Sequence, residues 1–244
     1  MTNKEKSSII QSGKEYFRQI IIPAHLKGLE GLKLKDFDVN PFLINYLAAF
    51  LCGNTESLSL AKALVYPRVL GTSINTSFGS NIQYFITGLK EITSSGSAIP
   101  GIDIEFTDAI DGRKKYCQCK AGPKTINRDD MNTILRNYKE FKNNTHWDSL
   151  CETTDDDFVV GVLFGGSSEL STNYKTISAT YPIYCGAEFW EHLTGDKHFY
   201  NRLTKAFGEV VEEDDTEEKR LINNVVKSLS EEISAYTYSV INAA

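Results

Sequence analysis

The residues of this sequence that could do chemistry are two pairs of polar side chains, each pair spaced two residues apart. Asp103 and Glu105 alternate with apolar residues in IDIEF, and Gln118 and Lys120 alternate with small residues in YCQCKA. A carboxylate is the hard anionic ligand that Mg²⁺ prefers, and an amide oxygen is a weaker neutral ligand or positions water. A lysine holds a phosphate, stabilises developing negative charge or orients the attacking water, and the sequence leaves these roles open. Such a set suits metal-assisted hydrolysis of a phosphodiester.

These side chains reach one another only if the two segments form neighbouring β-strands. Successive side chains of a strand point to opposite faces, so each polar pair shares one face and the apolar or small residues share the other. Asp111-Gly112, between the segments, is a tight-turn signal, and the pattern predicts an antiparallel hairpin. Cross-strand neighbours lie about 5 Å apart, which would bring the polar pairs together. The alternative, which spacing alone favours, is an edge strand with solubilising charges.

The first hundred residues are predicted to be mostly helical. Asn40-Pro41 supplies the N-cap and first turn of one helix, whose stretch FLINYLAAFL is apolar almost all round and is therefore expected to be buried. The other elements expected here are a helix over 4–22 that ends at Pro23, a helix over 55–65 that stops near Pro67, a loop over 72–79 and a helix over 78–92.

Beyond residue 100 the chain alternates strands with helices. FVVGVLF, within 155–166, has no polar alternation, which predicts a central strand covered on both faces. This order describes an α/β fold: a central mixed β-sheet flanked by helices. We expect one domain over 1–244, with 1–93 mostly helical, 100–193 as the sheet core and 197–244 as a helical C-terminal part. The remaining expected elements are a helix capped by Asp129 or Asp130 that runs to 142, a strand over 180–186, and helices over 187–193 and 215–242.

The charge distribution bears on the choice of partner. The net charge of −6 argues against a nucleic acid, but residues 113–142 carry nine Lys or Arg against three acids, a local charge of +6. A basic island in an acidic protein is compatible with DNA binding, because the local field governs attraction to phosphate. The alternative is a solvated, charge-rich face.

Cysteine usage and hydropathy indicate a compartment. Five cysteines are an odd number in a chain too large to need disulfides, which favours reduced thiols. Cys117-x-Cys119 lacks a second Cys or His pair at zinc spacing, which argues against a structural zinc site. No apolar run is long enough to span a bilayer and the N-terminus has no signal-peptide core, so we expect a cytoplasmic protein.

In the spacing of Asp103, Gln118 and Lys120, the sequence resembles the PD-(D/E)XK nuclease superfamily, in which an acid on one strand is followed by acid-x-Lys on the next. Here the pattern appears as IPGIDIEF followed by CQCK. The longer string QCKAGPKTIN resembles a group of type II restriction endonucleases with a Q-x-K-(S/A)-G-P-x-T-I-N signature. Further segments that resemble those enzymes, in the same order, are NPFLINYLAAF, PRVLGTSINTSFG, VVGVLFGG and YCGAEFWEHL.

The resemblance implies a restriction-endonuclease-like core and Mg²⁺-dependent, sequence-specific cleavage of double-stranded DNA by a homodimer at a short palindromic site. It also implies a functional pairing with a DNA methyltransferase. Asp103 would be the first metal ligand, Gln118 would occupy the usual acid's position and Lys120 would be the catalytic lysine. This sequence departs from the superfamily pattern in two ways: Gly101-Ile102 stands where Pro is often found, and Gln118 replaces the acid. The second departure changes the charge of the metal site. Glu105 on the same strand face would compensate, or an acid from a helix, such as Glu91 or Glu56.

The segment that follows Lys120 is expected to contact the DNA backbone. Gly122-Pro123 ends the strand, and the start of the next helix presents hydroxyl, amide and backbone donors to a phosphate. The residues assigned to this contact are Lys124, Thr125, Asn127 and Arg128. Base reading needs polar side chains that reach a groove edge, for which the loops 165–176 and 71–81 are candidates.

Two other functions remain open from the sequence. A repair or recombination nuclease on the same fold would act on DNA structure and would give no discrete bands from a plasmid. An inactive DNA-binding module is favoured by the missing acid at Gln118.

Overall fold

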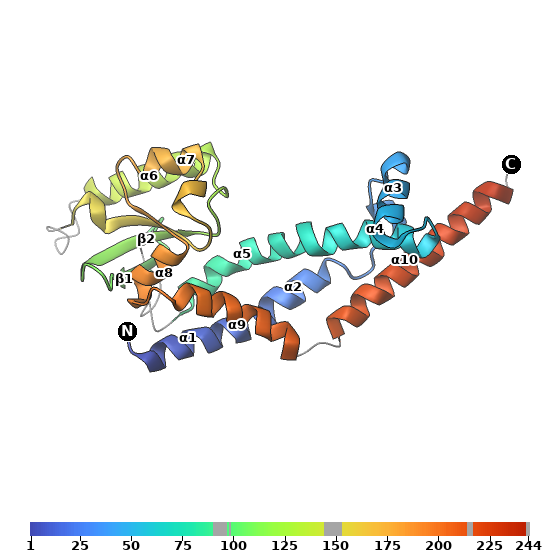
Figure 1. Cartoon of the computed structure of the whole chain (residues 1–244). Coiled ribbons are helices and arrows are strands. Elements are labelled where there is room, and N and C mark those ends of the chain that lie inside the picture. Colours follow the sequence, from blue (N-terminus) through green and yellow to red (C-terminus); the bar gives the residue numbers. More distant parts are fainter. Residues whose placement is uncertain (90–96, 98, 144–152, 214–216, 243–244) are drawn as a thin grey trace. The chain divides into compact units, whose positions relative to one another are not determined.

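The computed structural model describes residues 1–89, 97, 99–143, 153–213 and 217–242 (Figure 1). The chain groups into two compact units: unit 1 is residues 1–16 with 81–208, and unit 2 is residues 17–80 with 209–244. Each unit has its own buried apolar core. The predicted sheet lies in unit 1, and the action of residues 1–244 as one endonuclease domain stays a prediction.

Unit 1 is built around a four-stranded mixed sheet, as predicted. The strands are β1 (Ile104–Thr107), β2 (Lys114–Lys120), β3 (Phe158–Val162) and β4 (Ile183–Cys185), in the order β1-β2-β3-β4. β1 and β2 are antiparallel, and the predicted hairpin is thereby confirmed. β3 is parallel to both β2 and β4, which makes it an inner strand.

Helices cover both faces of this sheet (Figure 1). All residues of β3 are buried, as its unbroken apolar run predicts. On one face Val160 and Val162 share a core with Tyr138 of α6 (Arg128–Asn143) and Tyr174 of α7 (Thr172–Ile177). On the other face the ring of Phe189 from α8 (Ala187–Thr194) lies so close to Gly161 that a Cβ there would be 2.3 Å from it. Each fully buried large apolar side chain contributes about 1.5–3 kcal/mol.

Three further helical segments complete unit 1. They are α1 (Asn3–Tyr16), the part of α5 (Ile74–Thr87) from residue 81 and the part of α9 (Phe199–Glu213) up to residue 208. A Cβ at Gly13 would lie 2.9 Å from the ring of Phe207 and 3.2 Å from that of Phe85, so glycine lets α1 approach both rings.

Unit 2 is helical. Its core joins α4 (Ser57–Pro67) to α10 (Glu217–Asn242) through Ala61, Val65, Val225 and Leu229. The other helices of this unit are α2 (Ile22–Lys27), α3 (Pro41–Cys52) and the first part of α5. In the described ranges no helix combines the length and apolar content that crossing a bilayer requires.

The predicted helix end at Pro23 is wrong, whereas α4 ends at Pro67 as predicted. Helix continues past Pro23 to Lys27, and a π-helical turn at Phe17–Ile21 precedes the proline. A second π-helical turn, Arg68–Ser73, follows Pro67 and leads into α5, so the loop predicted over 72–79 is helical. Proline removes one backbone donor and clashes one turn back, and a wider turn beside it absorbs both effects without ending the helix.

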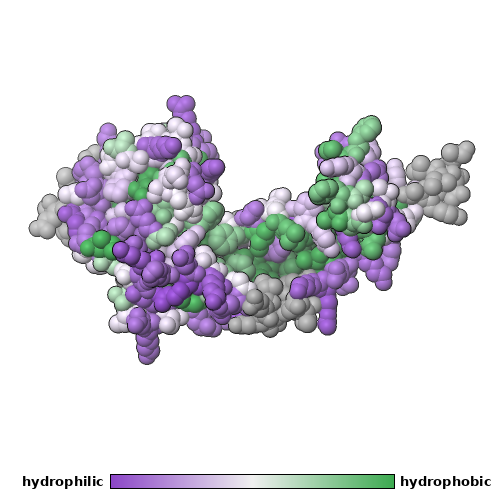
Figure 2. Space-filling view, viewed as in Figure 1, coloured by the Kyte–Doolittle hydropathy of each residue, from purple (hydrophilic) through white to green (hydrophobic). Residues whose placement is uncertain are grey.

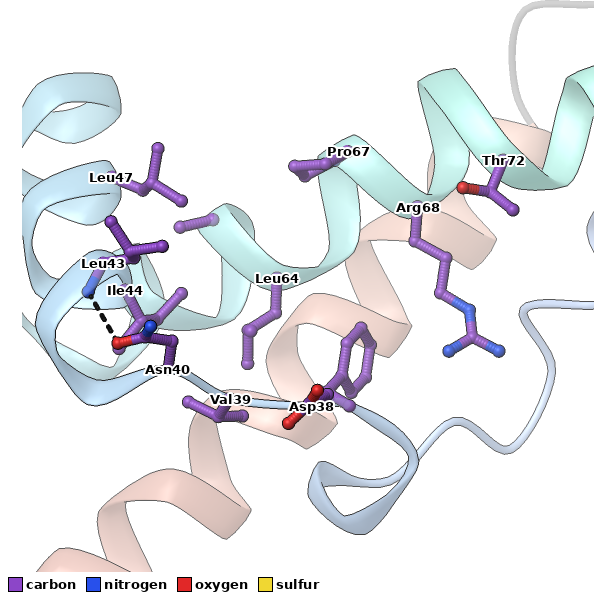
Figure 3. Close-up of a pocket in the computed structure, with 12 residues that line it drawn as sticks. Asp38, Val39, Asn40, Leu43, Ile44, Leu47, Leu64, Pro67, Arg68 and Thr72 are labelled. Atoms are coloured by element: carbon purple, nitrogen blue, oxygen red, sulfur yellow. Dashed lines mark hydrogen bonds between the residues drawn. The ribbon is translucent and has the colours of Figure 1, made fainter.

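The predicted burial of α3 is also wrong, although its cap is as predicted. The side chain of Asn40 accepts hydrogen bonds from the backbone of Phe42 and Leu43. Phe42, however, is 88% exposed and Phe50 is 78% exposed, and hydrophobic surface is visible over α3 (Figure 2). Ile44 and Ala48 are the buried residues of α3, and they pack against α4. A groove of about 440 Å³ runs beside this helix (Figure 3).

Candidate nuclease site

Asp103 lies immediately before β1, where the hairpin opens. Its backbone N–H donates to the carbonyl of Cys117 at 2.9 Å, and its carboxylate Oδ2 accepts from the backbone N–H of Cys119 at 2.7 Å. Burial raises the pKa of Asp103, while the Cys119 hydrogen bond and the positive charge of Lys120 oppose that rise. A half-buried carboxylate with few partners is strongly attracted to a cation.

Gln118 lies beside this carboxylate on β2 with an unused oxygen. Its backbone N–H donates to the hydroxyl of Tyr138 at 3.1 Å. Its side-chain Oε1 is buried and, among the residues that the structure describes, has no hydrogen-bond partner. Leaving such an acceptor unsatisfied costs about 1–3 kcal/mol. The amide oxygen is therefore available to a ligand that the protein itself does not supply.

Lys120 is the last residue of β2 and is half-buried. It pairs with Val162 of β3, and its carbonyl accepts from the N–H of Leu163 at 2.9 Å. Alternation along β2 puts its side chain on the same face as that of Gln118, and its positive charge lowers the pKa of Asp103. The structure thus brings Asp103, Gln118 and Lys120 to one end of the hairpin.

The sulfur-bearing face of β2 is buried, as predicted, since Cys117 and Cys119 have no exposed surface. The opposite face is not fully open, because α6 covers part of it and buries the Gln118 oxygen.

Glu105 is engaged elsewhere in this structure. Its carboxylate forms an ion pair with Lys114 at 2.7 Å and accepts from the hydroxyl of Ser97 at 2.7 Å. Burial opposes ionisation of Glu105, but these two partners outweigh it and lower the pKa of its carboxyl. Of the two helical acids considered as replacements, Glu56 is the N-cap of α4 in unit 2, and Glu91 lies outside the described residues.

Gly101 accounts for one departure from the superfamily pattern. It has a φ of +82°, a conformation that L side chains rarely adopt, and a Cβ there would lie 2.2 Å from Nδ2 of Asn137 on α6. The backbone that leads into Asp103 therefore requires glycine at this position, and proline with its fixed negative φ cannot replace it.

The connection from Lys120 to α6 uses two of its predicted DNA-binding side chains internally. The hydroxyl of Thr125 donates to the carbonyl of Gly122 at 2.8 Å. The Oδ1 of Asn127 accepts from the N–H groups of Asp129 and Asp130 at 2.8 and 2.9 Å, so Asn127, not either aspartate, is the N-cap of α6. The Asp130 carboxylate accepts in turn from the Asn127 N–H.

These bonds leave few backbone donors at the start of α6 for a phosphate, and two acids stand in its first turn. Lys124 and Arg128 are exposed and, within the described ranges, have no carboxylate partner. They are the positive groups that this connection offers to DNA.

The segment after β3 supports this connection. Ser171 donates its N–H to the carbonyl of Pro123 at 3.0 Å, Asn173 donates Nδ2 to Ile126 at 3.1 Å, and Tyr174 donates its hydroxyl to Gly122 at 3.0 Å. Part of the predicted base-reading loop 165–176 is therefore a support for residues 121–127. The other predicted reading loop, 71–81, is mostly helix α5.

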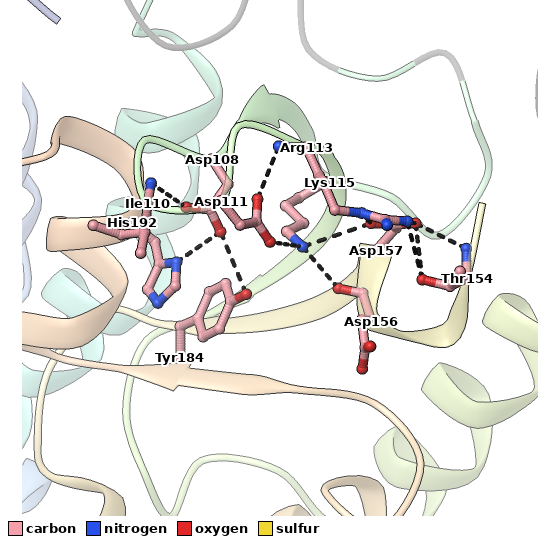
Figure 4. A network of polar contacts seen from close by, with 10 residues as sticks. All are labelled: Asp108, Ile110, Asp111, Arg113, Lys115, Thr154, Asp156, Asp157, Tyr184 and His192. Carbon is pink, nitrogen blue, oxygen red and sulfur yellow. Dashed lines mark hydrogen bonds and ion pairs between the residues drawn. The ribbon is translucent and has the colours of Figure 1, made fainter. Parts of the chain in front are cut away.

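A network of buried charges braces the opposite end of the sheet (Figure 4). Lys115, 1% exposed, forms ion pairs with Asp111 at 2.6 Å and Asp157 at 3.6 Å. Asp157 is also paired with Arg113. Asp108 is buried, and its carboxylate Oδ2 lies 2.6 Å from Nδ1 of His192. These groups hold the hairpin turn to the start of β3, and no motif spacing in the sequence predicts their pairing.

The residues at the site fit a Mg²⁺ ion. Among the described residues no three His, Cys, Asp or Glu side chains gather as a metal cluster. Mg²⁺ keeps several waters and is commonly held by one or two carboxylates together with substrate phosphate oxygens. The Asp103 carboxylate and the unpartnered Gln118 oxygen supply such a minimal set.

Comparison with known protein families identifies the class of protein. Residues 9–215 match the model of a family of type II restriction endonucleases. The family is that of type II restriction endonuclease EcoO109I, and the chain belongs to it. No curated protein matches the chain. Membership makes the chain a nuclease of the restriction class that acts on DNA, and the predicted class is confirmed.

Proposed function

We propose that this protein cleaves double-stranded DNA at a short palindromic sequence in a Mg²⁺-dependent reaction. The observation that carries the proposal is the buried Oε1 of Gln118, which has no hydrogen-bond partner in the described part of the chain and lies on the strand face shared with Lys120, beside the Asp103 carboxylate. An oxygen pair next to an ammonium is the arrangement that phosphodiester hydrolysis needs.

Asp103 and Gln118 are the proposed metal ligands. A bound Mg²⁺ would polarise the scissile phosphate and lower the pKa of a coordinated water. The backbone N–H of Cys119 fixes the orientation of the Asp103 carboxylate. Glu105 is a further ligand in the proposal, but it must leave Lys114 to serve, so we expect its removal to cost less than removal of Asp103.

Lys120 is the proposed catalytic lysine. Its ammonium stabilises negative charge on the phosphate or orients the attacking water. Lys124 and Arg128 contact the DNA backbone, while Thr125 and Asn127 hold the connection that presents them. The Asn127 amide nitrogen, which the cap does not use, is the donor that we assign to phosphate.

The protein is proposed to act as a homodimer, because a palindromic duplex has two-fold symmetry and two active sites cut both strands. We further propose a cytoplasmic enzyme paired with a DNA methyltransferase that protects the host sequence.

The test is digestion of a plasmid of known sequence with Mg²⁺ and with EDTA. We expect discrete fragments whose ends map to one sequence, with no cleavage by Asp103→Ala or Lys120→Ala. Lys205→Ala, which removes an exposed lysine of α9, is the matched control and should cut normally. Cleavage by either site variant at the wild-type rate refutes the site.

The two alternatives give different results in the same digest. A smear or structure-dependent nicking indicates a repair nuclease, and a gel shift without cleavage indicates a DNA-binding protein that has lost activity.

A further inference from the structure

Phe164 is an exposed aromatic residue at the end of the sheet that carries Lys120. It lies two residues after β3 and is 41% exposed. The backbone N–H of Leu163 donates to the carbonyl of Lys120 at 2.9 Å, and that of Phe164 donates to the carbonyl of Ala121 at 3.3 Å. An apolar side chain therefore reaches the surface beside the strand end that bears the proposed catalytic lysine.

The ring of Phe164 rests on the connection that follows Lys120. A Cβ at Gly122 would lie 2.5 Å from Cζ of this ring, so the absence of a side chain at Gly122 makes room for the ring. Gly122 stands two residues after Lys120 and two residues before the exposed Lys124. Along this connection the ring is therefore placed between two lysines.

The turn that carries Phe164 is held by close backbone contacts. Gly165 has a φ of +96°, and a Cβ there would lie 2.7 Å from Cγ of Pro123. A Cβ at Gly186, which precedes α8, would lie 2.1 Å from the carbonyl oxygen of Gly165. The carboxylate of Glu169 accepts from the N–H of Gly166 at 2.6 Å and is thus engaged within the turn. A ring on such a fixed backbone loses little conformational freedom when it binds a partner.

The size of the exposed surface selects among possible partners. Aromatic side chains have about 150–250 Å² of surface, so the exposed part of Phe164 is roughly 80 Å². A stable protein interface buries about 800 Å² on each partner, which is far more than one ring supplies. In duplex DNA the faces of the bases are stacked, and an aromatic ring reaches them only where a base step is opened. The deoxyribose is the apolar group of DNA that a single ring can cover without opening the stack.

We propose that Phe164 packs on the deoxyribose between the phosphate held at Lys120 and the next phosphate, which is held by Lys124. The order of lysine, aromatic ring and lysine then matches the order of phosphate, sugar and phosphate along one DNA strand. Every nucleotide carries the same sugar, so this contact anchors the strand and reads no base. The inference rests on the proposed function, which supplies the DNA strand and the role of Lys120.

The first test is single-turnover cleavage, with Mg²⁺, of a duplex that contains the cut site mapped from the plasmid digest. Phe164→Ala should raise the half-saturating protein concentration about 10-fold and leave the rate at saturation within about twofold, since the contact is an aromatic packing on a nucleotide. Phe164→Leu, which keeps an apolar side chain, should cost about 3-fold and serves as the second variant if alanine prevents folding. Ile110→Ala alters an exposed apolar residue of the hairpin turn and should behave as the wild-type protein.

The salt dependence of binding separates an apolar contact from a displaced charge. The affinity of Phe164→Ala should fall with salt as steeply as that of the wild-type protein, because no phosphate contact is removed. Lys124→Ala should show a slope that is shallower by about one counterion. A shallower slope for Phe164→Ala would mean that the substitution disturbs the lysines, and it overturns the inference.

Modified nucleotides on either side of the cut phosphate identify the group that the ring touches. A tetrahydrofuran nucleotide keeps the sugar ring and lacks the base, so the loss caused by Phe164→Ala should persist. A three-carbon linker lacks the sugar ring, and at one of the two positions it should make the wild-type protein and Phe164→Ala bind alike. A loss that disappears with tetrahydrofuran assigns the ring to a base and overturns the inference, as does equal affinity of both proteins for unmodified DNA.

Failure of the inference is distinguishable from failure of the proposed function. A wild-type protein that cuts DNA no better than Phe164→Ala overturns only the Phe164 contact. A wild-type protein that shifts a DNA fragment in a gel without cutting it refutes only the nuclease proposal, and the affinities measured in the gel then decide the contact. A protein that neither binds nor cuts DNA overturns both.

Discussion

The hydroxyl of Tyr138 accepts a hydrogen bond from the backbone N–H of Gln118 at 3.1 Å and donates one to the carbonyl of Val159 at 2.6 Å. A single side chain of α6 thus ties β2 to β3 at the residue that we assign to the metal. Tyr138 has no exposed surface, so water cannot replace either bond.

Tyr138→Phe is expected to destabilise the protein by about 1–3 kcal/mol, because it leaves two buried backbone groups without partners. The measurement is urea unfolding followed by the fluorescence of Trp190, a buried residue of unit 1. Tyr181→Phe, which changes another tyrosine of the same core, is the control. An equal loss in both variants would mean that the Tyr138 hydroxyl has no special role.

Substitution of Gln118 separates metal binding from folding. Gln118→Leu should stabilise the metal-free protein by about 1–3 kcal/mol, because it removes a buried unsatisfied oxygen, while it abolishes Mg²⁺-dependent cleavage. Gln118→Glu should keep cleavage and lower the Mg²⁺ concentration that gives half-maximal rate. A Leu variant that is less stable in EDTA than the wild-type protein would show that the oxygen has a partner.

Gly101→Ala should destabilise unit 1 for two reasons that can be separated. The positive φ costs roughly 1–2 kcal/mol for an L residue, and the added Cβ would overlap Nδ2 of Asn137. In the double variant Gly101→Ala/Asn137→Ala the overlap is gone and only the backbone cost remains. Urea unfolding of the two variants measures the difference, and Gly112→Ala is the control, with a similar φ of +73° and nothing within 4 Å. If the Gly101 and Gly112 variants lose equal stability, Asn137 imposes no constraint.

Asp157 makes stability depend on pH at the acid end. Burial opposes ionisation of this residue, which is 3% exposed, but hydrogen bonds from Arg113 and Thr154 outweigh it and lower its pKa from 3.8 to about 2. A carboxyl group whose pKa is lower in the folded than in the unfolded protein stabilises the folded state at pH values above its unfolded pKa. This contribution to stability is lost as the pH falls from 3.8 through about 2.

Asp157→Asn should therefore lose about 2 kcal/mol at neutral pH, and the difference from the wild-type protein should shrink between pH 4 and pH 2. The free energy of unfolding of both proteins across this range checks the prediction. A difference that is constant with pH would assign the loss to packing and not to the charge.

The hairpin could be predicted because a period of two is a local property of a strand. Ile104 and Cys117 alternate with polar neighbours, and Asp111-Gly112 is a tight-turn signal. The two strands, their antiparallel pairing and the face that the polar side chains share could therefore be predicted from residue spacing. The buried run that forms β3 was equally readable. None of these inferences required knowledge of any distant part of the chain.

The other features of the fold and the site depend on tertiary contacts, which residue spacing does not predict. The apolar composition of α3 predicted burial, but how much of a helix is buried is decided by the elements that pack against it. In the part of the chain that the structure describes, the buried residues of α3 pack against α4 and the rest of α3 is not buried. Asp129 or Asp130 was predicted to be the N-cap of α6, but the side chain of Asn127 accepts hydrogen bonds from the backbone N–H groups of both and is the N-cap. The unpartnered oxygen of Gln118 is a consequence of α6 covering the sheet, which no motif records.

The contact of Gly13 with Phe207 has a consequence for synthesis of the protein. Because Phe207 follows Gly13 by most of a unit in the sequence, α1 cannot complete this contact before α9 has been synthesised. The core of unit 2 is likewise incomplete until α10 has been synthesised, because α10 follows its packing partner α4 in the sequence. Neither unit reaches its final packing before these later segments are synthesised. A truncated chain that ends before α9 therefore contains the hairpin residues but lacks part of the core of unit 1.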